Sequence, residues 1–199
     1  MAGNEAPKKR RLFVGTFLSA HDQQLLDQLR ETDARLAQLW QRKLRWVHGK
    51  KMHLTWLFLG HVGEHHIDEI KKRLATIAAQ HPPTRLDYNQ SEFWPSPKYA
   101  RLLVLTPRVV PDEVYSLERD ILTALREYLQ KEEKRKYQPH ITLMRIEPGP
   151  KQVLEIPEWV NLAKRLPVHH KIDCIDIIES NPSRGEEAYV SLQSFRLKL

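Results

Sequence analysis

The chain has 199 residues, of which 41% are hydrophobic and 29% charged, and its 32 Lys and Arg residues outnumber 25 Asp and Glu residues to give a net charge of +7. This length suits one sizeable core rather than two independent domains, and the composition excludes a wholly disordered chain. The excess of positive charge favours a polyanionic partner such as RNA, with an ordinary basic protein as the alternative.

Cysteine usage and apolar content indicate a cytoplasmic protein. Cys174 is the only cysteine, so the chain can form no intrachain disulfide and no Cys-based metal site. No apolar run approaches the ~18 residues of a transmembrane helix, and the N-terminus lacks the apolar segment of a secretory signal. We therefore expect a reducing, cytoplasmic setting and no membrane partner.

The chain begins with a predicted basic tail, residues 1–10, and residues 11–199 are predicted to form one domain. Residues 11–18 are mostly apolar, β-branched or aromatic, which is typical of a buried strand. Ser19 is a residue type favoured at the N-cap, and leucines at helical spacing predict one helix from there to about residue 42.

The rest of the chain alternates between strand and helix patterns. Helical periodicity predicts two amphipathic helices, at residues 64–80 and 111–130. Short apolar runs bounded by Gly and Pro predict strands at residues 44–47, 52–59, 84–94, 99–106, 140–146, 171–179 and 187–197. This order predicts an α+β fold of two similar halves with a cleft between them.

Two of the predicted strands carry the same pattern, His-apolar-Thr-apolar. The first motif is His53-Leu54-Thr55-Trp56 and the second, 87 residues later, is His140-Ile141-Thr142-Leu143. Alternate side chains of a strand leave on the same face, so each motif presents an imidazole and a hydroxyl together, with apolar residues behind them. A chain of this composition would contain roughly 0.07 such quartets by chance, so the repeat indicates a function.

Two imidazoles facing one cleft would suit the hydrolysis of a phosphodiester. In-line attack on phosphorus needs a base on one side and an acid on the other. Imidazoles titrate near pH 6.5 and supply both at neutral pH if one starts neutral and the other protonated. The hydroxyls of Thr55 and Thr142 would donate hydrogen bonds to the non-bridging phosphate oxygens, although threonine is also an ordinary strand residue.

The two motifs resemble the paired HxTx motifs of the 2H phosphoesterase superfamily, and most closely those of the RNA 2′,3′-cyclic phosphodiesterases, historically called 2′-5′ RNA ligases. Flanking similarities occur at Arg11-Leu12-Phe13-Val14, Leu57-Phe58-Leu59-Gly60, Pro139, Arg145 and Glu179-Ser180. The resemblance implies a bilobal α+β (LigT-like) fold, in which two antiparallel sheets related by a pseudo-two-fold axis have helices outside and a groove at the centre.

The resemblance also implies the reaction and the roles of the motif residues. RNA 2′,3′-cyclic phosphate ends would be hydrolysed to 2′-phosphomonoesters, with His53 as proton donor and His140 as proton acceptor. Arg145 would bind the phosphate, although strand parity places it on the face opposite to His140. A β-bulge or the end of the strand would have to turn it toward the groove, and a structural charge is the alternative.

No metal or other cofactor is expected. His61, His65 and His66 have a spacing that a zinc-binding helix could use. Gly60 and Gly63 interrupt any helix there and no cysteine joins the three histidines. We interpret them as surface residues.

Other functions remain open from the sequence. The same groove could join a cyclic-phosphate end to a 5′-hydroxyl end, such as those of tRNA halves, reversibly and without ATP. The protein could instead be an RNA- or nucleotide-binding module of this fold without turnover, or a phosphodiesterase acting on a small cyclic nucleotide or an ADP-ribose cyclic phosphate. The positive charge favours RNA, and we expect a monomer.

Overall fold

The computed structural model describes residues 8–28, 33–131, 135–149, 153–157, 168–181, 183 and 188–198. The predicted N-terminal tail lies outside these ranges up to residue 7, and the first strand already begins at Lys9. The elements are, in chain order, β1 (Lys9–Phe17), α1 (Ala20–Asp27), α2 (Asp33–Trp40), β2 (Leu44–Trp46), η2 (Gly49–Lys51), β3 (His53–Gly63), η3 (Glu64–His66), α3 (Ile67–Ala78), β4 (Thr84–Trp94), η4 (Pro97–Tyr99), β5 (Leu102–Pro107), α4 (Asp112–Leu125), η5 (Arg126–Tyr128), β6 (Ile141–Ile146), β7 (Val168–Ile172), β8 (Cys174–Ser180) and β9 (Tyr189–Arg196).

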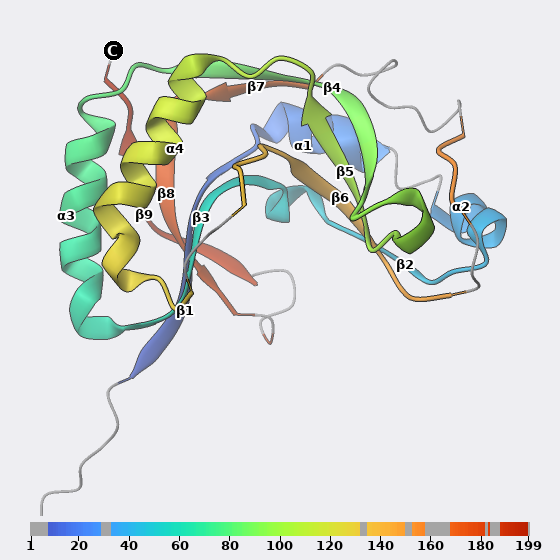
Figure 1. Cartoon of the computed structure of the whole chain (residues 1–199), viewed down its shortest axis with the longest axis horizontal. Coiled ribbons are helices and arrows are strands. Elements are labelled where there is room, and N and C mark those ends of the chain that lie inside the picture. The colour runs from blue at the N-terminus through green and yellow to red at the C-terminus, as the bar shows by residue number, and fades with distance from the viewer. Residues whose placement is uncertain are drawn as a thin grey trace, which may run out of the picture.

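The strands form one curled antiparallel sheet that divides into two halves (Figure 1). In the order β7-β4-β5-β6-β3-β1-β8-β9, with β2 added on β6, the motif strands β3 and β6 lie at the centre. Counted from the centre of the sheet to its edge, the first half consists of β3, β1, β8 and β9, and the second half of β6, β5, β4 and β7. β3 pairs with β6 through one residue pair, Leu54 with Ile141. The predicted α+β fold is confirmed, and the two antiparallel sheets that were predicted are the two halves of one sheet, joined by this pair.

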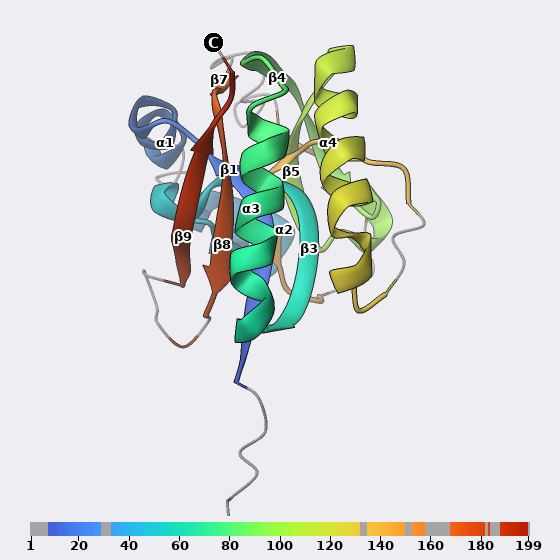
Figure 2. The ribbon, with the colours of Figure 1, turned by 90° about the vertical axis from the view of Figure 1, so that its left-hand side faces the viewer.

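The helices cover the outside of the sheet, and Figure 2 shows α3 and α4 side by side. α3 packs on β8 and β9, while α4, which connects β5 to β6 in the second half, packs on β3 of the first half. In return α1, which follows β1 of the first half, contacts β7 of the second. Each half therefore supplies a helix to the other. None of the helices in the described part of the chain is long and apolar enough to span a membrane.

Two of the predicted elements are each divided into two in the structure. The helix predicted from Ser19 to residue 42 is two helices with different partners, since α1 contacts η2 and β7 whereas α2 contacts β2; residues 29–32 between them lie outside the described ranges. The strand predicted at residues 171–179 is also two. It is interrupted at Asp173 because β7 pairs with β4 in the second half, whereas β8 pairs with β1 in the first.

The centre of the core is the contact between the two motif strands. Leu54 and Ile141 are both 0% exposed, and the next apolar residue of each motif, Trp56 or Leu143, is buried as well. Complete burial of such a side chain stabilises the fold by about 1.5–3 kcal/mol. The apolar residues of the motifs therefore hold the two halves together.

We expect Ile141→Ala to lower the free energy of unfolding by about 2–5 kcal/mol, because it leaves a cavity at a fully buried position. Urea unfolding followed by circular dichroism measures this change. Val109→Ala is the control, since Val109 is 74% exposed, and it should change the free energy by less than about 0.5 kcal/mol. Equal effects of the two substitutions would show that the Leu54–Ile141 contact does not carry the stability assigned to it.

Candidate active site

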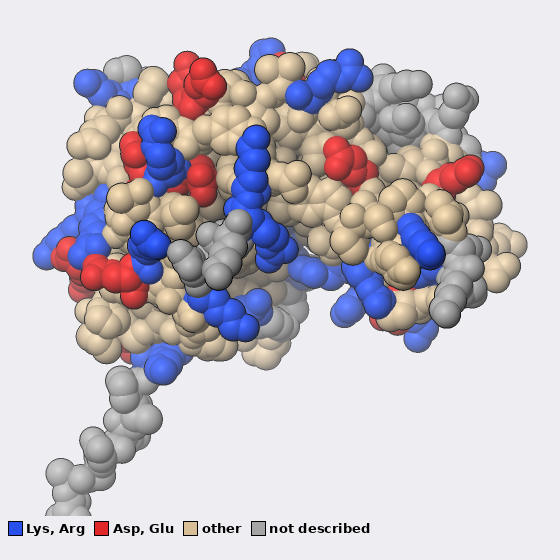
Figure 3. Space-filling view, in the orientation of Figure 1, with Lys and Arg blue, Asp and Glu red and all other residues tan. Residues whose placement is uncertain are grey.

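A cleft of about 650 Å³ opens between the two halves of the sheet. Figure 3 shows the hollow between the two lobes, with Lys and Arg side chains along its rim. The five residues that the sequence singles out, His53, Thr55, His140, Thr142 and Arg145, all line this cleft. The other lining residues are Arg11, Leu12, Phe13, Arg45, Val47, Lys51, Phe58, Gly60, Ser180 and Tyr189.

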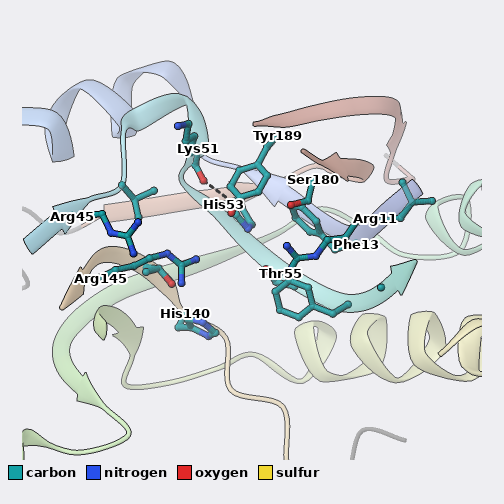
Figure 4. A pocket seen from close by; sticks show the side chains of 15 residues that line it. Arg11, Phe13, Arg45, Lys51, His53, Thr55, His140, Arg145, Ser180 and Tyr189 are labelled. Carbon is teal, nitrogen blue, oxygen red and sulfur yellow. Dashed lines mark hydrogen bonds between the residues drawn. The ribbon is translucent and has the colours of Figure 1, made fainter. Parts of the chain in front are cut away.

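The pairing of β3 with β6 explains why both motifs face the cleft. Leu54 and Ile141 are the second residues of their motifs and pair with each other in the core. The neighbours of a buried strand residue point to the opposite face. In each motif the histidine before the buried residue and the threonine after it therefore point toward the cleft. The two imidazoles come to lie on opposite walls of the cleft (Figure 4).

A β-bulge turns Arg145 toward the cleft. In the ladder between β5 and β6, Leu103 pairs with Met144 and Val104 pairs with Thr142, so Leu143 is an extra residue without a partner of its own. The consecutive residues Leu143 and Met144 are both buried in consequence. The bulge reverses the parity beyond it, as bulges do, and this resolves the strand-parity conflict noted from the sequence.

The first motif also contains a β-bulge. In the ladder between β1 and β3, Val14 pairs with Leu57 and Gly15 pairs with Thr55, so Trp56 is the extra residue. Trp56 and Leu57 are both buried, and the next side chain, Phe58, lines the cleft. Phe58 follows His53 by five residues, as Arg145 follows His140. Sequence reasoning did not select Phe58, although comparing the two motifs position by position would have found it.

The two imidazoles are held in the same way. Nδ1 of His53 lies 2.6 Å from the carbonyl oxygen of Lys51, and Nδ1 of His140 lies 2.9 Å from that of Gln138. A carbonyl oxygen only accepts, so Nδ1 of each ring donates and carries the proton. Nε2 of each ring is therefore available to a substrate. It can act as a base when the ring is neutral and as an acid when the ring is protonated.

The surroundings of both rings disfavour the imidazolium form. The centroid of the His53 ring lies 4.8 Å from that of Phe13 and 5.0 Å from that of Tyr189. Burial lowers the pKa of His53 to about 4; the hydrogen bond to Lys51 opposes this effect, and the charges of His140 and Arg145 add to it. Burial also lowers the pKa of His140, whose ring lies 4.3 Å from that of Trp94. Both imidazoles are therefore neutral at pH 7 in the free protein.

The cleft is cationic. Among the described residues, four Lys and Arg side chains line it and no Asp or Glu does: Arg11, Arg45, Lys51 and Arg145. Arg45 and Arg145 lie directly opposite each other on β2 and β6, a position in which like charges repel. Glu147 lies 3.9 Å from Arg45 at an exposed site, where an ion pair contributes little. An anion between the two arginines would relieve the repulsion.

Arg45 is a site residue that sequence reasoning missed. It stands in a predicted short extended segment, residues 44–47, with no motif around it. Only the pairing of β2 with β6, about a hundred residues away in the chain, brings it beside Arg145. No local sequence signal contains that information.

The histidines considered for zinc do not form a ligand cluster. In the described ranges no group of three or more His, Cys, Asp or Glu side chains could hold a metal ion. His65 and His66 lie with their ring centroids 3.9 Å apart on η3, outside the cleft. The absence of a metal requirement stays a prediction.

We expect NMR titration of the free protein to show the His53 ring neutral at pH 7 and titrating near pH 4. Inorganic phosphate should raise this pKa, because an anion in the cleft favours the imidazolium, which is the form present below the pKa. The resonances of His169, which lies on β7 outside the cleft, should not respond to phosphate. A His53 pKa that is the same with and without phosphate would contradict an anion site beside this ring.

The chain is similar in sequence to a family model and to two named proteins. Residues 20–104 match the model of the "LigT like Phosphoesterase" family. A protein of Aquifex aeolicus (strain VF5) named RNA 2′,3′-cyclic phosphodiesterase is 27% identical over 139 residues, which cover 68% of this chain and 70% of that protein. A protein of the same name from Bacillus subtilis (strain 168) is 29% identical over 109 residues, which cover 51% of this chain and 55% of that protein.

The fold is shared with solved structures. E. coli LigT complexed with 3′-AMP superposes with a TM-score of 0.71 at 22% identity, covering 96% of this chain and all of that one. The TT0787 protein of Thermus thermophilus also gives a TM-score of 0.71, at 19% identity, over 94% of this chain and 98% of that one. The partial family match, the two named relatives and the shared fold agree with the paired motifs in the cleft and with a similarity of this chain to the LigT-like phosphoesterases.

Proposed function

We propose that the protein hydrolyses RNA 2′,3′-cyclic phosphate ends to 2′-phosphomonoesters. The observation that supports this most directly is the geometry of one cleft, in which two imidazoles face each other with a threonine beside each. The cations that line this cleft favour an anionic substrate. The names of the two relatives give the same substrate class.

In the proposed reaction a water molecule attacks phosphorus in line with the departing 3′ oxygen. Nε2 of His140 accepts the proton of the water as the new P–O bond forms. Nε2 of His53 donates a proton to the 3′ oxygen as the P–O3′ bond breaks, which leaves a 2′-phosphate and a free 3′-hydroxyl. The two rings end with their protonation states exchanged, and proton transfer through solvent restores the starting state.

The lowered pKa of His53 makes the bound anion part of the mechanism. The acid form of His53 is scarce at neutral pH while the cleft is empty, because burial, with smaller contributions from the charges of His140 and Arg145, lowers its pKa to about 4. A cyclic phosphate carries a negative charge into the cleft, and this charge favours the imidazolium. Substrate binding and protonation of His53 therefore promote each other.

Threonine and arginine side chains complete the proposed phosphate site. The hydroxyls of Thr55 and Thr142 donate to the two non-bridging oxygens from opposite walls, where charge shifts during the reaction. The guanidinium of Arg145, turned inward by its bulge, pairs with the same oxygens. Arg45 adds a second cation opposite Arg145.

The histidine substitutions separate this enzyme from a binding module. We expect His53→Ala and His140→Ala each to lower the rate with a short RNA ending in a 2′,3′-cyclic phosphate by roughly 10²- to 10⁴-fold. Binding of the same RNA should change little. The product of the unaltered protein, identified by mass and by comparison with 2′- and 3′-phosphate standards, should be the 2′ isomer.

His169→Ala is the matched control, because His169 is exposed and pairs with Asp87 outside the cleft. All reactions should run equally in EDTA, as no metal is needed. Binding of the RNA without turnover by the unaltered protein would establish the binding module instead. Activity lost in EDTA and restored by zinc would establish a metal requirement.

The surroundings of His140 favour RNA joining as a second activity. Trp94 lies beside His140 and borders a second cleft of about 1030 Å³, together with Arg101, Arg135 and Gln138. In the proposed reaction the nucleophile enters on the His140 side. A 5′-hydroxyl RNA end bound in this second cleft would take the place of water and form a 2′-5′ linkage. The same groups would catalyse the reverse reaction.

We expect tRNA halves with a cyclic phosphate and a 5′-hydroxyl to give some joined product without ATP, visible on a denaturing gel. Trp94→Ala should lower joining more than hydrolysis, because only joining needs the second RNA end beside His140. Tyr99→Ala is the control, since Tyr99 is an exposed aromatic residue that lines neither cleft. Hydrolysis without any joined product would remove this activity from the proposal.

A further inference from the structure

Tyr137 connects the chain that leads to the second motif with the first motif. Its hydroxyl lies 3.1 Å from the carbonyl oxygen of Thr55 on β3. Burial raises the pKa of Tyr137 well above its usual range, so the hydroxyl keeps its proton and donates a hydrogen bond to this carbonyl. Tyr137 stands three residues before His140 in the sequence. The proposed base therefore follows a residue that is bound to the opposite wall of the cleft.

The ring of Tyr137 packs on a fixed part of the first half. It stacks on Trp56, the bulge residue of β3, with the ring centroids 5.9 Å apart and an angle of 17° between the ring planes. Trp56 is buried, and its Nε1–H donates to Oγ1 of Thr16 on β1 over 2.9 Å. The same hydroxyl of Thr16 donates to the carbonyl oxygen of Cys174 on β8 over 2.8 Å. Trp56 is therefore held by two neighbouring strands, and it gives the ring of Tyr137 a rigid surface.

The connection from Tyr137 to the imidazole of His140 is short and stiff. Residues 136–140 belong to no helix or strand. Pro139 is buried and its ring fixes φ, while Gln138 has fewer conformations open to it because it precedes a proline. The carbonyl oxygen of Gln138 is the one that accepts from Nδ1 of His140 at 2.9 Å. The position of Tyr137 therefore determines where this carbonyl lies, and the carbonyl in turn orients the ring.

The carbonyl that orients His53 is held in a different way. It belongs to Lys51 at the end of η2. The backbone N–H of Lys51 donates to the carbonyl oxygen of His48 at 2.8 Å, and η2 packs against α1. His53 is therefore oriented within the first half, whereas His140 is oriented from the first half through Tyr137.

We propose that Tyr137 is a positioning residue, which sets the orientation of the His140 imidazole by tying the chain before the second motif to the carbonyl of Thr55. This inference rests on the proposed hydrolysis and adds a residue on which its rate depends. Without the hydroxyl, the chain around Gln138 gains freedom to move. A displacement of a catalytic group by about 1 Å costs roughly 10²-fold in rate. Tyr137 acts through His140 and does not contact the phosphate.

Tyr137→Phe tests the tie, because it removes the hydroxyl and keeps the stacked ring. NMR of the ring nitrogens at pH 7 gives the fraction of each neutral imidazole that carries its proton on Nδ1, and this measurement needs no turnover. We expect the fraction to fall for His140 and to stay the same for His53. Tyr128→Phe is the matched control and should change neither ring, because Tyr128 is also partly buried against the core but lies in η5, outside the cleft. An unchanged Nδ1 fraction of His140 in Tyr137→Phe overturns the proposal.

Turnover of a short RNA ending in a 2′,3′-cyclic phosphate gives the functional readout. Tyr137→Phe should lower kcat by roughly 10- to 100-fold and change KM by less than about twofold, because the substrate contacts the same side chains. Both variants should keep the circular dichroism spectrum of the folded protein, since each loses only a hydroxyl. Full activity of Tyr137→Phe, or a loss that appears in KM alone, overturns the positioning role while the hydrolysis stands. A fall in the Nδ1 fraction of His140, with no hydrolysis by the unaltered protein, supports the positioning and overturns the proposed reaction.

Discussion

The contact between Leu54 and Ile141 is the constraint on which the site depends. It is the residue pair through which β3 and β6 meet, and both side chains are completely buried. A slip of either strand by one residue would turn the histidine and threonine of its motif into the core and expose the apolar residues. The apolar residues that hold the halves together are therefore also the ones that align the two imidazoles across the cleft.

The positive charge of the cleft favours binding of an anion and disfavours protonation of its histidines. Within the described ranges four cations and no carboxylate line it, and the like charges of Arg45 and Arg145 face each other across β2 and β6. Burial, with a smaller contribution from the charge of Arg145, keeps His53 neutral. Proton affinity and phosphate affinity are linked by reciprocity, since an anion that raises the pKa of an imidazole is itself bound more tightly by the protonated form.

The parts of the site with local sequence signals could be predicted. Strand alternation placed His53, Thr55, His140 and Thr142 on the cleft face of their strands, and the two-half architecture followed from the order of elements. Arg45 could not be predicted, because its place beside Arg145 comes from a pairing of distant strands. The bulge at Trp56 escaped prediction, and a bulge before Arg145 was expected only as one of two ways to turn that side chain, since a run of buried residues such as Leu143-Met144 looks the same in a regular, fully buried strand.

The histidines alone do not decide which of them acts as the acid. In both rings Nδ1–H donates a hydrogen bond to the carbonyl oxygen of the residue two positions earlier, and burial lowers the pKa of both imidazoles. The two walls of the cleft differ in the side chain that follows the bulge. This side chain is the phenyl ring of Phe58 on β3 and the guanidinium of Arg145 on β6. A substrate bound between these two walls meets different side chains on each side. On this argument the orientation of the substrate, and not a difference between the imidazoles, assigns acid and base.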